Sequence, residues 1–93
     1  MPAALLVNDD EINIRTTLRS MLEMEGYDVT TAESAAEGLA RVGEADLVLL
    51  DVRLPDRNGL DVLADIRSRF DTPVLMMSGH GTIATAVRAT QLG

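Results

Sequence analysis

Four polar side chains of this sequence stand at the ends of apolar runs, where they could form one chemical site. The acidic pair Asp9 and Asp10 follows the run AALLV after a single asparagine, Asn8. Asp51 ends the run LVLL, and Ser78 ends the run VLMM. Carboxylate oxygens are good ligands for Mg2+, and a carboxylate beside such an ion can act as a nucleophile toward phosphorus. These residue types therefore indicate phosphoryl chemistry assisted by a divalent cation.

Three carboxylates in one site repel each other, and the repulsion can be relieved in two ways. The pKa of one carboxyl group can rise, or a divalent cation can bind. Mg2+ fits better than Ca2+, because it uses few carboxylates and keeps positions for water and a substrate phosphate. Taken singly, each residue has a simpler explanation, since an aspartate can cap a helix and an aspartate or serine can belong to a turn. Their joint placement at strand ends favours the functional interpretation.

The hydrophobic pattern predicts a strict alternation of strands and helices. Short apolar runs predict strands at residues 3–7, 27–32, 46–51 and 74–77. Helical spacing of apolar residues, with Ser34 as a cap and glycines near the ends, predicts helices at residues 11–25, 34–43, 60–70 and 82–92. The third strand is apolar on both faces, which is typical of a parallel sheet covered on both sides. The alternation therefore predicts an α/β fold.

A flavodoxin-like, doubly wound parallel sheet with the strand order 2-1-3-4 would bring the polar residues together. In this order the first and third strands are neighbours, and ligands bind beyond the carboxyl ends of the strands. Asp51 would then lie between the Asp9–Asp10 pair and Ser78. In the helix at residues 60–70, we expect Leu60 and two later apolar residues to face the core.

Length, charge and cysteine content exclude several other classes of protein. The 93 residues allow one domain, and a net charge of −7 argues against binding of nucleic acid by this segment. There is no cysteine, which excludes disulfides and zinc sites built on sulfur. No signal peptide and no run of membrane-spanning length is present, so we expect no membrane partner and a cytoplasmic location.

Three motifs resemble the receiver domains of two-component response regulators, and the resemblance extends over residues 1–93. LLVNDDE is similar to the first strand and acidic pair of that family, and LVLLDVRLPDRNGLDVL is similar to its phosphoacceptor strand and following loop. TPVLMMSGHG is similar to the fourth strand, which ends on a hydroxyl residue. The run SGHGTIATAV is also similar to receivers of the nitrogen-regulation type, which precede AAA+ activators of sigma-54 transcription.

The resemblance implies a role for each matching residue. Asp51 would accept a phosphoryl group from the phosphohistidine of a sensor histidine kinase. Asp9, Asp10 and Asp51, together with the backbone carbonyl of Arg53, would bind Mg2+. Ser78 would form a hydrogen bond with the phosphoryl group.

Three further positions are defined by the same resemblance. Arg53 and His80 match positions that tune dephosphorylation in the family, although a single histidine between two glycines is more simply an exposed loop residue. Asn8 stands where the family more often has an apolar residue or an aspartate, and we expect this difference to be harmless.

The resemblance also implies elements that do not occur in this sequence. Receiver domains continue with a fifth strand and helix, and that strand carries a lysine that pairs with the phosphoryl group and an aromatic switch residue. The sequence ends at Gly93, and all eight of its basic residues are arginines. We therefore expect a receiver domain that is incomplete at its C-terminus. The strand at residues 74–77 would then be a sheet edge through which two copies of the chain could pair.

Two other functions stay open from the sequence. Phosphohydrolases of the haloacid dehalogenase type also use an aspartyl nucleophile, but they place a second aspartate two residues later as general acid. Here Arg53 occupies that position and cannot donate and return a proton, so we expect a signalling domain rather than an enzyme. The alternative is a pseudo-receiver, an interaction or dimerisation module without productive phosphorylation, which would fit the missing lysine.

Overall fold

The computed structural model describes residues 2–77 as alternating strands and helices. The elements are β1 (Ala4–Asn8), α1 (Ile12–Met24), β2 (Asp28–Ala32), α2 (Ala35–Arg41), the short 3-10 helix η1 (Val42–Glu44), β3 (Leu47–Asp51), α3 (Gly59–Arg69) and β4 (Val74–Met77). The predictions for Ser78, for His80 and for a helix at residues 82–92 lie outside the described residues.

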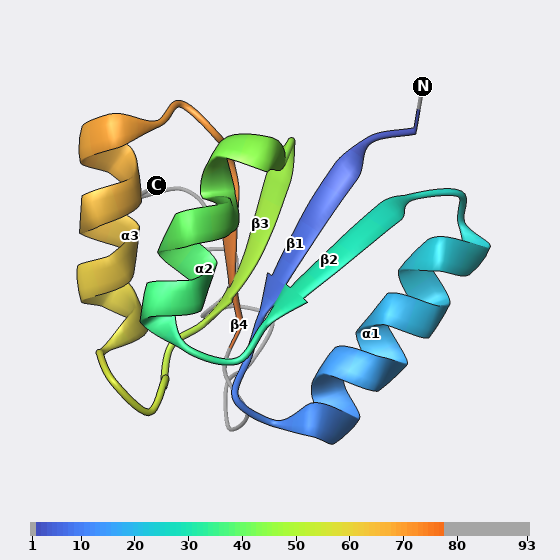
Figure 1. Cartoon of the computed structure of the whole chain (residues 1–93), viewed down its shortest axis with the longest axis horizontal. Coiled ribbons are helices and arrows are strands. Elements are labelled where there is room, and N and C mark those ends of the chain that lie inside the picture. The colour runs from blue at the N-terminus through green and yellow to red at the C-terminus, as the bar shows by residue number, and fades with distance from the viewer. Residues whose placement is uncertain (1, 78–93) are drawn as a thin grey trace.

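The four strands form one parallel sheet in the order β2-β1-β3-β4 (Figure 1). This order confirms the flavodoxin-like arrangement that the alternation of elements predicts. Asn8 at the end of β1 pairs with Ala32 on β2 and Leu50 on β3, and Asp51 pairs with Met77 on β4. The carboxyl ends of all four strands therefore meet at one edge of the sheet.

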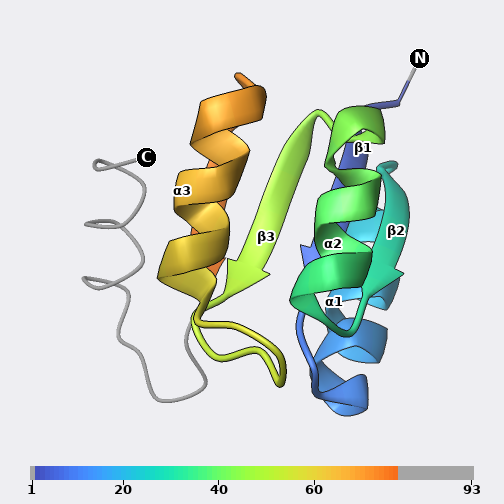
Figure 2. The same ribbon diagram turned by 60° about the vertical axis from the view of Figure 1, so that its left-hand side comes forward.

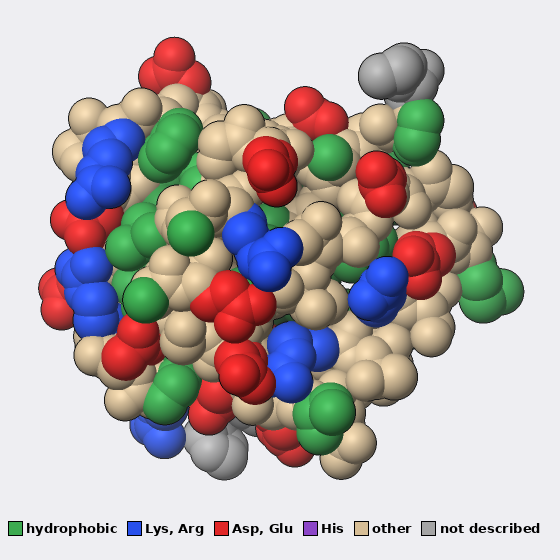
Figure 3. Space-filling model, viewed as in Figure 1, with side chains coloured by type: hydrophobic (Ala, Val, Ile, Leu, Met, Phe, Trp, Pro, Cys, Tyr) green, Lys and Arg blue, Asp and Glu red, His purple; other side chains and the backbone are tan. Residues whose placement is uncertain are grey.

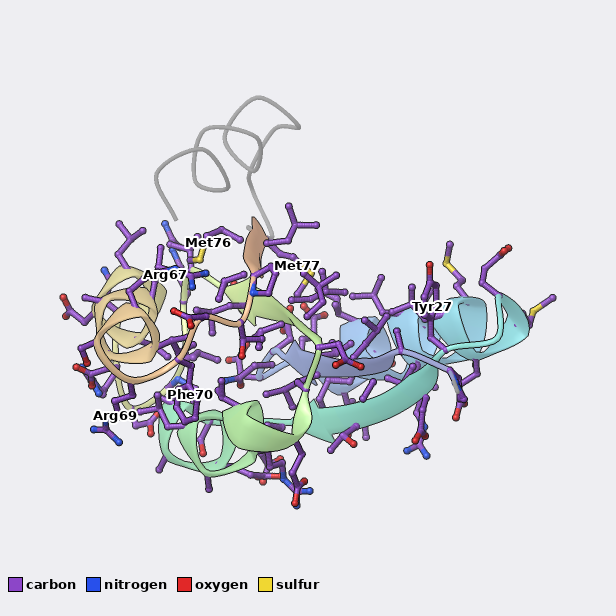
Figure 4. All side chains as sticks on the ribbon, turned by 90° about the horizontal axis from the view of Figure 1, so that it is seen from above. Tyr27, Arg67, Arg69, Phe70, Met76 and Met77 are labelled. Atoms are coloured by element: carbon purple, nitrogen blue, oxygen red, sulfur yellow. The ribbon has the colours of Figure 1, made fainter. Side chains whose placement is uncertain are left out.

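Helices cover both faces of the sheet, with α1 on one face and α2 and α3 on the other (Figures 1 and 2). Alternate strand residues face the two sides, so that Leu50 belongs to the core under α2 and α3 and Leu49 to the core under α1. Met76 and Met77 divide in the same way, with Met76 on the side of α3 (Figure 4). Burial of a large apolar side chain stabilises the fold by about 1.5–3 kcal/mol. This alternation therefore fixes the register that places Asp51 at the end of β3.

Helix α1 begins later than the acidic pair, so the N-cap interpretation of Asp9 and Asp10 is wrong. The N-cap residue of α1 is Glu11, and its side chain makes no capping hydrogen bond. At its other end, Gly26 follows α1 with a φ of 93°, a conformation that glycine adopts without strain. The acidic pair is therefore left in the turn between β1 and α1.

Helices α2 and α3 begin at side-chain caps. The Ser34 hydroxyl accepts a hydrogen bond from the backbone N–H of Glu37, as the capping prediction requires. Asn58 caps α3 through the N–H of Leu60. The predicted inward orientation of Leu60 is wrong, because 54% of that residue is exposed and Val62 is buried in its place. Leu60 lies in the first turn of α3, whose buried residues are Gly59, Val62, Leu63 and Ile66.

Within the described part of the chain, no helix is both long and apolar enough to cross a membrane.

Candidate functional site

Three carboxyl groups gather at the carboxyl edge of the sheet. One ligand oxygen from each of Asp9, Asp10 and Asp51 lies within 4.8 Å of the others. Asp9 and Asp51 are buried, whereas Asp10 is exposed. The site therefore has two carboxylates fixed in the protein and one that faces solvent.

Asp9 is held by hydrogen bonds on each of its polar groups. Its N–H donates to the carbonyl of Ala32 at 3.0 Å, which continues the pairing of β1 with β2. Its carboxylate oxygen Oδ1 accepts from the N–H of Glu11 at 2.9 Å, and its carbonyl accepts from Nη1 of Arg15 at 2.8 Å. Arg15 also pairs with Glu33 at 3.7 Å. These hydrogen bonds give Asp9 a defined position at the end of β1.

Asp51 is held by the strand that carries it and by the loop that follows. The N–H of Val52 donates to the carbonyl of Met77 at 2.8 Å, and the N–H of Arg53 donates to Oδ1 of Asp51 at 3.1 Å. Gly59, the first residue of α3, packs so closely that a Cβ there would overlap the backbone carbonyl of Asp51. Glycine at this position lets α3 start directly against the end of β3.

Burial raises the pKa of Asp51 to about 6. The hydrogen bond from the Arg53 N–H acts against this shift, and the neighbouring charges of Asp9 and Asp10 add to it. The rise follows the expectation from three adjacent carboxylates, but removal of Asp51 from water is a larger cause than repulsion. A cation bound among the three groups would offset both effects.

The donor set fits Mg2+. It offers three carboxylates whose oxygens lie close together, and one of these residues remains open to solvent, where water or a phosphate oxygen could complete the coordination. The backbone of Arg53 follows directly after this group and is already joined to Asp51. The metal ligand role of the Arg53 carbonyl stays a prediction, as does the phosphoryl contact of Ser78, which lies outside the described residues.

Sequence reasoning missed two residues around this site. Asn8 is fully buried, and in the amide orientation that satisfies both ends of its side chain the nitrogen donates to the carbonyls of Ala32 at 3.2 Å and Ser34 at 3.1 Å. A polar residue at the end of a buried strand is the signal for these hydrogen bonds, and the expectation that Asn8 is harmless does not include them. Asp56 joins the loop after Asp51 to the start of α2, and no local pattern in the sequence indicates this contact.

Residues 5–93 match the family described as the response regulator receiver domain, and the chain belongs to this family. The chain is 43% identical over 94 residues to the DNA-binding transcriptional regulator NtrC of Rhizobium meliloti. It is 40% identical over 90 residues to the transcriptional regulatory protein CpxR homolog of Haemophilus influenzae. The crystal structure of NtrX from Brucella abortus is 40% identical and superposes with a TM-score of 0.85 over the whole chain. The predicted similarity to receivers, including those of the nitrogen-regulation type, is confirmed.

The chain spans only part of these relatives. The match with NtrC includes 98% of this chain but 19% of NtrC. The match with the CpxR homolog includes 96% of this chain but 40% of that protein. In the NtrX structure it covers 22% of that chain. The match is therefore to the receiver portion of longer regulators. It does not include the remaining parts of those proteins.

Proposed function

We propose that this chain is the phosphoacceptor switch of a two-component system, with Asp51 as the residue that is phosphorylated. The observation that carries the proposal is the gathering of three carboxylates around a buried Asp51 in a chain of the receiver family. Asp51 stands at the end of β3, which lies between β1 and β4, and it pairs with Met77 on β4. It is thus held rigidly at the point where ligands of such sheets bind.

Transfer of the phosphoryl group would proceed from the phosphohistidine of a sensor histidine kinase. An oxygen of the Asp51 carboxylate attacks phosphorus, the phosphorus–nitrogen bond breaks, and the imidazole leaves with the electron pair and takes up a proton. Mg2+ bound by Asp9, Asp10, Asp51 and the Arg53 carbonyl would supply positive charge to the phosphoryl oxygens. Ser78 would donate a hydrogen bond to the same oxygens.

Phosphorylation by a small donor tests this proposal. The protein is incubated with acetyl phosphate and Mg2+, and its intact mass is measured. We expect a gain of one phosphoryl group per chain, no gain for Asp51→Asn, and a strong reduction for Asp9→Asn. Asp61→Asn, which removes an exposed carboxylate from the first turn of α3, is the matched control and should behave as the wild type.

Two results would contradict the proposal. Phosphorylation of Asp51→Asn at the wild-type level would place the acceptor elsewhere. Absence of phosphorylation in the wild type at saturating Mg2+ would instead favour the pseudo-receiver alternative, in which the domain acts only through its interactions.

The charges on the surface support a protein partner rather than a nucleic acid for this segment. Arginine side chains on the face that carries α2 and α3 stand among carboxylates and form no continuous basic surface there (Figure 3). Arg41 pairs with Glu37 at 3.6 Å, and Arg57 pairs with Asp65 at 2.6 Å. Such pairs leave little positive charge for a phosphate backbone. The cytoplasmic location stays a prediction that fits a kinase as the partner.

The outer edge of β4 supports a second proposal, that two copies of the chain associate through this strand. Among residues 2–77, β4 pairs with β3 on one side only, so its other side offers backbone hydrogen-bonding groups and apolar side chains. We expect the average mass in sedimentation experiments to rise with protein concentration. A constant monomer mass at high concentration would exclude pairing through this edge.

A further inference from the structure

The loop between β3 and α3 is closed at its base. Arg53 and Asn58 form an antiparallel backbone bridge, and both residues are fixed by further hydrogen bonds. The N–H of Arg53 donates to Asp51, and the Asn58 side chain caps α3 through the N–H of Leu60. Residues 53–58 therefore form a closed loop whose first residue is joined to the proposed phosphoacceptor.

The tip of this loop is attached to a different helix. The two carboxylate oxygens of Asp56 accept hydrogen bonds from the N–H groups of Ala35 at 2.8 Å and Ala36 at 3.0 Å. Figure 2 shows the loop extending from the end of β3 towards the start of α2. Ser34 and Asp56 together satisfy the first three N–H groups of α2, although only Ser34 is a local cap. These hydrogen bonds also hold the pKa of Asp56 below its usual value.

The start of α2 is in turn joined to the other side of the acidic site. The N–H of Asp9 and the side chain of Asn8 both donate to the carbonyl of Ala32, and the Asn8 side chain also donates to the carbonyl of Ser34. Residues 32–36 thus contact Asn8 and Asp9. Through Asp56 they also contact the loop that follows Asp51.

We propose that Asp56 is a positioning residue for the metal and phosphoryl site. Its two side-chain hydrogen bonds go to the start of α2, and it acts by fixing the Arg53–Asn58 loop against the segment that also holds Asp9. This inference rests on the proposed function, since it assigns Asp56 to the same Mg2+ site. The competing interpretation is that Asp56 only caps α2 and contributes stability.

A comparison of two capping variants separates these interpretations. Asp56→Ala removes the cap that comes from the loop, whereas Ser34→Ala removes the local cap of the same helix and leaves the loop attached. We expect Asp56→Ala to weaken Mg2+ binding by about tenfold in calorimetric titrations, as loss of a residue that orients metal ligands does. Ser34→Ala should bind Mg2+ as the wild type, with a similar loss of thermal stability.

Two further variants test whether the loss of a negative charge alone weakens Mg2+ binding. Asp61→Asn removes one negative charge near the start of α3 and none of the observed hydrogen bonds, so its Mg2+ affinity should remain within about twofold of the wild type. Asp56→Asn keeps one oxygen acceptor for the N–H groups of α2 and should recover part of the affinity that Asp56→Ala loses. An effect of charge alone would make Asp56→Asn as weak as Asp56→Ala.

Amide hydrogen exchange without metal gives a readout that is independent of Mg2+ binding. Asp56→Ala should increase exchange at the N–H groups of Arg53 and Gly59, which are bonded in the closed loop, whereas Ser34→Ala should not. Equal Mg2+ affinity and equal loop exchange in Asp56→Ala and Ser34→Ala would overturn the positioning role. A wild type that binds no Mg2+ would instead overturn the proposed function, and the exchange data would still decide whether Asp56 orders the loop.

Discussion

The burial of Asp51 is costly for the folded state and useful for the proposed reaction. Only 7% of the residue is exposed, and the acidic pair Asp9–Asp10 lies beside it. Removal from water raises its pKa to about 6, so a large fraction of the unbound protein carries a proton on Asp51 in mildly acidic solution. A cation that binds the carboxylate must displace this proton, so metal binding should weaken as the pH falls through 6.

The same shift predicts that Asp51 lowers stability at neutral pH. The folded state binds the proton more tightly than the unfolded state, whose pKa is 3.8, so the free energy of unfolding falls as the pH rises from 3.8 to about 6. In metal-free buffer, Asp51→Asn should raise the free energy of unfolding at pH 7 by about 1–2 kcal/mol and reduce this pH dependence.

Urea denaturation at pH 4 and pH 7 with a chelator measures this effect. Asp61→Asn, the exposed control, should keep the pH dependence of the wild type. If Asp51→Asn were less stable than the wild type at pH 7, the carboxylate would be stabilising, and the cause given for its pKa shift would be incorrect.

Individual site residues could be predicted from the sequence where local signals coincide with strand ends. Asp9, Asp10 and Asp51 each follow an apolar run, and the strand order then brings the runs together. Asp56 could not be predicted in this way, because its partner Ala35 is 21 residues earlier in the chain. That contact depends on how the loop packs against the start of α2, and the hydrophobic pattern of the sequence does not indicate this packing.

At the scale of elements, the approach of α2 to β1 depends on one glycine. A Cβ on Gly38 would overlap the amide of Asn8, which is buried and bonded to the chain before α2. The space that a side chain at position 38 would need is therefore already filled by the side chain of position 8. The two hydrogen bonds of the amide nitrogen account for a polar residue in the core at this position.

Gly38→Ala should consequently destabilise the protein by about 1–3 kcal/mol through overpacking, even though alanine is the better helix former. The matched control is Gly43→Ala, because a Cβ at Gly43 would make an ordinary contact of 3.6 Å with the ring of Phe70. Asn8→Ala combined with Gly38→Ala should recover part of the loss that Gly38→Ala causes.

Thermal denaturation of the wild type, Gly38→Ala, Gly43→Ala and the double variant measures these differences in stability. A Gly38→Ala variant as stable as Gly43→Ala would show that α2 can shift without cost, and Asn8 would then not define the position of the helix.

The elements themselves were predicted more accurately than their ends and orientations. The buried strands β1 and β3 follow from their apolar runs, and Ser34 marks the start of α2. The acidic pair predicts the cap of α1 at Asp9 or Asp10, but the N-cap is Glu11, because aspartates favour both caps and tight turns and only tertiary contacts decide between them. In α3, the spacing of Leu60, Leu63 and Ile66 indicates one apolar face, but the buried face is formed by Gly59, Val62, Leu63 and Ile66. Glycine carries no hydrophobic signal, so the pattern alone favours the face that includes Leu60.

At the scale of the whole molecule, a net charge of −7 and three carboxylates gathered at one edge of the sheet predict that divalent cations stabilise the fold. An ion that binds only the folded state adds a free energy of RT ln(1 + [L]/Kd), about 2.7 kcal/mol when its concentration is a hundred times the dissociation constant. For a domain of this length, that stabilisation corresponds to a rise of about 10–20 °C in the midpoint of thermal unfolding.

We therefore expect Mg2+ to raise the unfolding midpoint of the wild type well above the effect of NaCl at equal ionic strength, which only screens surface charge. Asp51→Asn should start from a higher midpoint than the metal-free wild type, because the buried charge is gone, and should gain no more from Mg2+ than from NaCl. The two melting curves would then change their order as Mg2+ is added. That reversal requires one group to be both the destabilising carboxylate and a ligand of the ion. An equal gain in both proteins would place the ion elsewhere on the acidic surface and remove Asp51 from the metal site.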